Sequence, residues 1–100
     1  MNYIEELQDV IKRLHGTEAT YVETVPVKET FEGQTVWEGE VEVFDLADHP
    51  LASRVYAWAY DREDESKPTQ HVTVLQIPPA TTPQNAVKAS IVAEYKAQND

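Results

Sequence analysis

The 100-residue chain contains no cysteine, which excludes disulfide frameworks, thiolate metal sites and cysteine nucleophiles. It has only three glycines, and they form no phosphate-cradling loop. Its three serines are Ser53, Ser66 and Ser90. None of them lies in the G-x-S-x-G motif that exposes a catalytic serine on a sharp turn. The sequence therefore gives no support for nucleophilic catalysis.

Basic residues are scarce as well. Eight Lys and Arg stand against 18 Asp and Glu, so the formal net charge is −10. This balance opposes the phosphate neutralisation on which nucleic-acid binding depends, and we predict neither nucleic acid nor membrane as a partner. Seven of the acids lie from Glu29 through Asp48, where no Lys or Arg occurs. This region would attract a basic protein surface, although such acids also keep small domains soluble.

No apolar run approaches the length of about 20 residues that a membrane span needs. The first fifteen residues mix acids with apolar residues at helical spacing, whereas a signal peptide needs a basic start and an unbroken apolar stretch. We therefore predict a cytoplasmic protein. The length fits one domain over residues 1–100, and 41% hydrophobic residues provide for one core.

The spacing of apolar residues predicts a helix over 3–15, with Asn2 as its cap and Gly16 after its end. A first strand follows over about 20–31, and its Pro26 places it at a sheet edge or over a bulge. The turn FEGQ leads into a second strand over about 35–44. There Trp37, Val41 and Val43 alternate with Glu38, Glu40 and Glu42, while Phe44 and Leu46 change phase, which suggests a bulge or the strand's end.

A third strand is predicted from about Arg54 to Asp61 and a fourth over 70–77, with a charged turn between them. Thr82 can cap a last helix that begins at Pro83 and runs to about Gln98. One side of this helix carries Ala86, Val87, Ser90, Ile91 and Tyr95.

The fold class is therefore α+β: a helix, a four-stranded antiparallel meander sheet and a second helix. Short connections between successive strands favour the meander, and two amphipathic helices of this length most simply cover one face of it. We expect both helices on the same face. The other face is then left for solvent, a ligand or another subunit.

The third strand, RVYAWAY, is apolar on both sides. Tyr56, Trp58 and Tyr60 share one face, and Val55, Ala57 and Ala59 share the other. We favour the rings inside, because large rings interdigitate with the small residues of the last helix, namely Ala86, Ala89 and Ala93. In the alternative, outward rings would form a patch that needs a partner.

The candidate ligand- or partner-binding residues are the acidic and aromatic rows of strands two and three: Glu38, Glu40, Glu42, Tyr56, Trp58 and Tyr60. Rings beside carboxylates suit amines or the Lys and Arg side chains of a partner. Exposed carboxylates with ordinary pKa values are poor general acids at neutral pH, so a glycosidase is disfavoured.

The histidines have structural explanations. His15 lies in the last turn of the first helix, where a cation is favoured, and His71 opens the fourth strand. Asp45, Asp48 and His49 form D-x-x-D-H, which could hold a hard divalent ion through oxygens and one imidazole, although its spacing matches no specific metal motif. We predict no metal and no cofactor.

These observations favour a non-enzymatic protein-interaction module that forms a homodimer through its open sheet face, with a basic protein surface as a further partner. The alternative is a domain that binds a cationic or amine small molecule, or acts on it, through the aromatic and acidic rows.

Overall fold

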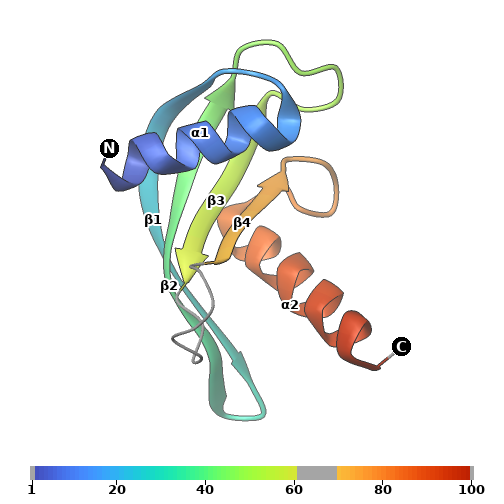
Figure 1. Cartoon of the computed structure of the whole chain (residues 1–100). Helices are drawn as coiled ribbons and strands as arrows, with labels where there is room; N and C mark the ends of the chain where they lie inside the picture. The colour runs from blue at the N-terminus through green and yellow to red at the C-terminus, as the bar shows by residue number, and fades with distance from the viewer. Residues whose placement is uncertain (1, 61–69, 100) are drawn as a thin grey trace.

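The computed structural model describes residues 2–60 and 70–99 (Figure 1). Helix α1 spans Tyr3–His15 and helix α2 spans Pro83–Asn99. Between them lie four strands, which are β1 (Ala19–Phe31), β2 (Gln34–Leu46), β3 (Arg54–Tyr60) and β4 (Gln70–Leu75). They form one antiparallel sheet in the order β1-β2-β3-β4. The predicted α+β class and antiparallel meander are confirmed.

Helix α1 begins and ends where its sequence predicts. The Asn2 side chain accepts a hydrogen bond from the Glu5 N–H at 2.8 Å, and Gly16 closes the helix in the left-handed conformation at φ 70°. The apolar stripe buries Leu7 and Ile11 completely, because these residues face the sheet. Leu14, at the end of the predicted stripe, is 63% exposed.

Strands β1 and β2 form a long hairpin whose two-residue turn consists of Glu32 at φ 51° and Gly33 at φ 79°. Positive φ angles at both positions match the twist of the two strands. Strand β2 pairs with β3 only from Glu42 to Asp45, so the far half of the hairpin projects beyond the rest of the sheet (Figure 1). Strand β1 is at the sheet edge, as Pro26 predicts.

The expected bulge or strand end at Phe44 is not found in β2, which continues to Leu46. The irregularity lies instead in β1, where Val22 is skipped between Tyr21 and Glu23 in the register. Phe44 therefore stays on the same face as Glu42. The apparent change of phase arises because β2 is buried on both faces along this segment.

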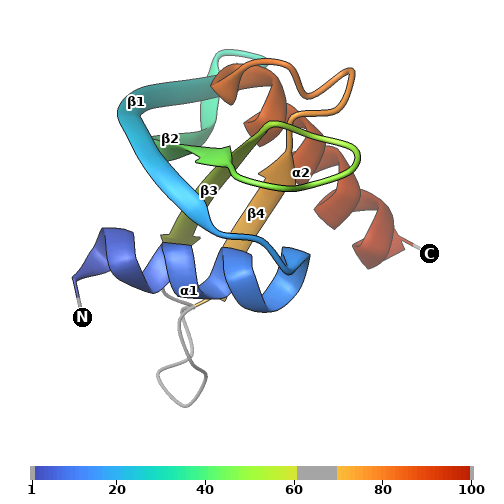
Figure 2. The ribbon, with the colours of Figure 1, turned by 90° about the horizontal axis from the view of Figure 1, so that it is seen from above.

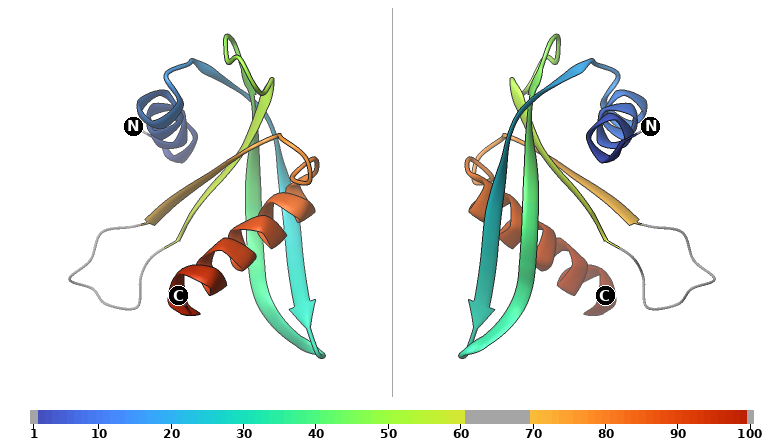
Figure 3. Two further views of the ribbon diagram at one scale, coloured as in Figure 1. Left: turned by 90° about the vertical axis from the view of Figure 1, so that its right-hand side faces the viewer. Right: turned by 90° about the vertical axis from the view of Figure 1, so that its left-hand side faces the viewer.

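The two helices cover opposite faces of the sheet. Beneath α1 lies one buried cluster: Leu7, Ile11, Ala19, Phe44, Leu46, Ala52, Val55 and Ala57. The other face and α2 form a second cluster: Val27, Val41, Val43, Tyr56, Trp58, Ala86 and Val87. Figure 2 and Figure 3 show α1 and α2 on either side of β3 and β4.

The prediction that both helices share one face is therefore wrong. Strand β3 presents apolar side chains in both directions, and each set has to be removed from water. A single covered face would have left Val55 and Ala57 exposed, whereas both are fully buried under α1. The consequence is that no wholly open sheet face remains over β3.

The favoured orientation of the rings is confirmed for Tyr56 and Trp58, each only 2% exposed beneath α2. Trp58 also packs edge to face against Trp37, with ring centroids 5.5 Å apart. Tyr60, at the end of β3, is 41% exposed. The predicted pairing of large rings with small helical residues holds for Ala86, which is fully buried in the same cluster.

In the parts of the chain that the structure describes, neither helix combines the length and the apolar character that crossing a membrane requires.

Candidate functional site

The predicted acidic and aromatic rows lie on opposite faces of the sheet. Val43 is the register partner of Tyr56, which places the rings on the face covered by α2. Successive side chains of β2 point to opposite faces. Val43 faces α2, so the opposite face carries the even-numbered residues of this segment: Glu38, Glu40, Glu42 and Phe44. The structure therefore does not bring the rings and the carboxylates together into one surface.

The three glutamates also differ from one another in exposure. Glu38 and Glu40 are exposed on the projecting hairpin, whereas Glu42 is only 4% exposed. The Glu42 carboxylate accepts a short hydrogen bond from the Thr24 hydroxyl. Since the Thr24 proton is used there, the Tyr21 hydroxyl donates to Thr24, with 2.6 Å between the oxygens. Glu42 thus belongs to a polar network across the hairpin.

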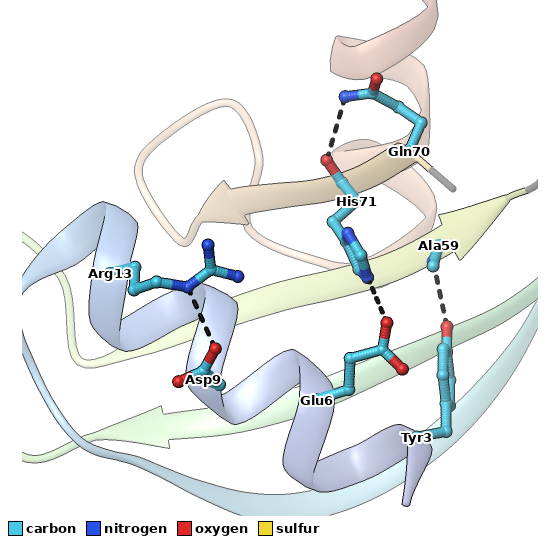
Figure 4. Close-up of polar contacts among 7 residues, drawn as sticks. All are labelled: Tyr3, Glu6, Asp9, Arg13, Ala59, Gln70 and His71. Atoms are coloured by element: carbon cyan, nitrogen blue, oxygen red, sulfur yellow. Dashed lines mark hydrogen bonds and ion pairs between the residues drawn. The ribbon is translucent and has the colours of Figure 1, made fainter. Parts of the chain in front are cut away.

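The Tyr3 side chain occupies the place where β2 separates from β3. Its hydroxyl oxygen accepts a hydrogen bond from the Ala59 N–H at 3.0 Å (Figure 4). Burial raises the pKa of Tyr3, and the nearby carboxylates of Glu42, Glu6 and Glu40 raise it further. Tyr3 therefore remains a neutral phenol and satisfies a backbone donor that β2 no longer reaches.

A second polar contact ties α1 to β4. The His71 imidazole lies 2.7 Å from a Glu6 carboxylate oxygen (Figure 4). The two residues are 65 positions apart in the chain, so no local sequence pattern predicts that they meet. Its effect is to hold the first turns of α1 over the start of β4.

His15 is placed in the last turn of α1, but the environment does not favour its cation as expected. Burial lowers the pKa of His15, and His49 lowers it further, with ring centroids 6.2 Å apart. The His15 imidazole also shares a 2.8 Å hydrogen bond with the Thr73 hydroxyl. The pair has the reach of a base and a nucleophile. In a catalytic pair a carboxylate usually orients the histidine, whereas the ring beside His15 is that of His49. We therefore interpret the His15–Thr73 hydrogen bond as a structural contact between α1 and β4.

Because the folded protein disfavours protonated His15, His15 should make stability depend on pH. The unfolded chain binds a proton near pH 6.5, the ordinary pKa of the group, while the folded chain binds it only at lower pH. This contribution to stability is present above that pKa and is lost as the pH falls through it toward the lowered folded value. The free energy of unfolding is measured in urea at about pH 7.5 and at about pH 5.5. We expect the decrease between these two pH values to be smaller for His15→Gln than for the parent protein. Identical losses would contradict this assignment.

The D-x-x-D-H loop is held by hydrogen bonds of its own. The His49 Nδ1 atom accepts from the backbone N–H groups of Leu51 and Ala52, at 3.1 and 3.2 Å. Asp45 pairs with Arg54 at 3.0 Å. Across residues 2–60 and 70–99, no three His, Asp or Glu side chains are arranged to hold a metal ion.

An apolar groove, which the sequence reading missed, lies between the far end of the β1–β2 hairpin and α2. Its volume is about 710 Å³. The residues that line this hairpin groove are Glu29, Thr30, Phe31, Val36, Lys88, Ile91 and Val92. Three of them are large apolar residues with high exposure: Phe31 at 68%, Val36 at 48% and Val92 at 51%.

The hairpin groove was hidden in the sequence because its residues come from three elements and follow no single period. Val36 is the residue skipped at the second register shift of the hairpin, and Val92 lies next to the predicted buried side of α2. Comparison of the chain with known protein families, with curated proteins and with solved structures finds no match.

Proposed function

We propose that the protein is a non-enzymatic interaction module, acting in the cytoplasm, that forms a homodimer through the free edge of β4. The expected dimer through an open sheet face loses its support, because α1 and α2 cover opposite faces. A ligand site built on the ring row loses support as well, since Tyr56 and Trp58 are buried. The observation that carries the proposal is the contrast between the two edges of the sheet.

The β1 edge has several of the devices that prevent strands from pairing with other chains. Pro26 supplies no donor, and the irregularity at Val22 interrupts the strand. The Gln84 side chain donates to the Lys28 carbonyl at 3.1 Å. The Gln8 side chain donates to the Ala19 carbonyl at 2.8 Å. Together these features make β1 a poor template for another strand.

The β4 edge carries fewer such devices among the described residues. Its His71 carbonyl accepts from the Gln70 side chain at 3.3 Å and its Leu75 carbonyl from the Ile77 N–H at 2.8 Å, but no proline removes a backbone donor from this edge. Its sequence QHVTVL is rich in β-branched residues and contains no proline, and it pairs with β3 in an uninterrupted register from Gln70 to Leu75.

Ala59 of β3 lies opposite His71 of β4. The Ala59 N–H points away from β4, toward Tyr3, so these two residues form a pair that exchanges no hydrogen bonds. The backbone N–H and C=O groups of His71 therefore point away from β3, toward the outer edge of β4. Two residues further on, the N–H of Thr73 faces the free edge in the same way.

Charge also favours β4 as the place where two copies meet. Two chains of net charge −10 repel each other, so an interface that brings carboxylates face to face would be weak. Strand β4 contains no Asp, Glu, Lys or Arg. Antiparallel pairing of β4 with the β4 of a second copy would be self-complementary and would join two sheets into one.

A proline at Thr73 tests this interface. Thr73→Pro removes an edge donor without removing a hydrogen bond to β3, and we expect it to weaken the dimer by about tenfold or more in sedimentation over a concentration series. Thr73→Val is the matched control, because it also loses the bond to His15 but keeps the N–H. It should remain dimeric.

Two results would contradict the proposed dimer. One is a parent protein that stays monomeric at hundreds of micromolar. The other is a dimer whose dissociation constant is the same for Thr73→Pro, Thr73→Val and the parent.

A further inference from the structure

From the hairpin groove we infer a docking site for a basic amphipathic helix of another protein. The inference deepens the proposed interaction role by naming a partner class, but it uses a surface separate from the β4 edge.

Large apolar side chains with high exposure gather at this groove. Phe31, Val36 and Val92 are each about half exposed or more, and they line one continuous hollow. Contiguous apolar patches on soluble proteins mark interaction sites, whereas single exposed apolar residues need no explanation. The projecting half of the hairpin provides one wall of the groove and α2 provides the other (Figure 1).

The shape favours a helix as the occupant. A second apolar hollow of about 510 Å³ lies on the other side of the exposed ridge of α2 and shares Lys88 and Val92 with the groove. Its other lining residues are Pro79, Asn85, Ala89 and Ala93. Because the two hollows share Lys88 and Val92, they adjoin along α2 and together offer a longer surface than either hollow alone. An amphipathic helix presents such a surface with anchors at positions i, i+3, i+4 and i+7.

The charge around the groove defines the flanks of the partner. Within the lining, Glu29 accepts a short hydrogen bond from Gln84 and lies 4.0 Å from the Lys88 ammonium group, so the one lining cation has an acid beside it. Glu32 follows Phe31 in the turn, and Glu94 lies one helical turn beyond Ile91; both are exposed. Carboxylates near the apolar lining are complementary to a partner that carries Lys or Arg beside its apolar anchors.

A synthetic peptide of about 18 leucines and lysines, with the leucines on one helical face, provides the probe. Its binding is measured by fluorescence anisotropy of the labelled peptide. Two peptides serve as controls: one with the same composition in scrambled order, and one with glutamate in place of every lysine. We expect the leucine-lysine peptide to bind about tenfold or more tightly than either control.

The double variant Phe31→Ser with Val92→Ser removes the apolar lining at two exposed positions and should fold normally. We expect it to bind the peptide about tenfold or more weakly. The matched control is Leu51→Ser, a 73% exposed apolar residue in the loop between β2 and β3, at the end of the molecule opposite the hairpin turn (Figure 1). It should bind as the parent does.

Three results would overturn the inference: equal affinity of the double variant and the parent, equal affinity for the lysine and glutamate peptides, or loss of the dimer in the double variant. The last would assign the groove to a second copy. Because sedimentation follows the dimer and anisotropy follows the peptide, failure of the docking site is distinguishable from failure of the β4 interface.

Discussion

Ala57→Asp should destabilise the folded domain by on the order of 4 kcal/mol or more, enough to unfold much of the protein at ambient temperature. Ala57 is fully buried in the cluster beneath α1. A carboxylate there would lose its hydration without gaining a cationic partner within that apolar cluster. Urea unfolding followed by circular dichroism measures the effect.

The matched control is Ala47→Asp, which places the same carboxylate at an exposed position after β2. It should change the free energy of unfolding by about 0.5 kcal/mol or less. If Ala57→Asp proved as stable as this control, the α1 face of β3 would have to be open to water, contrary to the structure.

Tyr56→Ala should have the second large effect, a loss of about 3 to 5 kcal/mol in the free energy of unfolding. The ring fills the cluster beneath α2, and its hydroxyl donates to the Thr81 carbonyl at 3.1 Å and accepts from the Gln76 side chain at 2.9 Å. Tyr56→Phe keeps the ring and loses these two contacts, so it should cost only about 1 to 3 kcal/mol.

Tyr60→Ala serves as the control for the same face of β3, because Tyr60 is 41% exposed. Its effect should be clearly smaller than that of Tyr56→Ala. Equal effects of the two alanine variants would contradict the burial of Tyr56 beneath α2. Both unfolding series use the same urea measurement as the Ala57 variants.

Most of the secondary structure could be predicted because local signals agreed with the final fold. The Asn2 cap, the left-handed Gly16 and the positions of Pro26 and Pro83 act through backbone geometry, which needs no tertiary information. The meander followed from short connections between successive strands. The motif FEGQ likewise predicts the hairpin turn, whose two central residues both have positive φ.

The side of the sheet on which each helix packs could not be predicted from the assumption that two amphipathic helices cover the same face. The sequence contains two relevant signs, and neither of them alone places a helix. Both faces of RVYAWAY are apolar, and Phe44 and Leu46 are apolar on the face that carries Glu38 and Glu40. Taken together, these signs indicate that the face carrying Glu38 and Glu40 is also covered at its Phe44 end, so that both faces of the sheet are buried there, which a sheet covered on one side does not allow.

The candidate site was the least predictable part. Contacts such as His71 with Glu6, or Tyr3 with Ala59, join residues more than 50 positions apart. The hairpin groove likewise depends on how far β2 extends beyond β3, which is a property of the register between strands. Sequence patterns report the period of one element, whereas these features arise from the meeting of several.

The opposite placement of the two helices is tested most directly by nuclear Overhauser contacts of two neighbouring residues in β3. We predict that the Ala57 methyl group shows contacts to side chains of α1, such as Leu7 and Ile11, and that the Trp58 ring shows contacts to Ala86 and Val87 of α2. Contacts from both helices to Trp58, with none from α1 to Ala57, would contradict this arrangement.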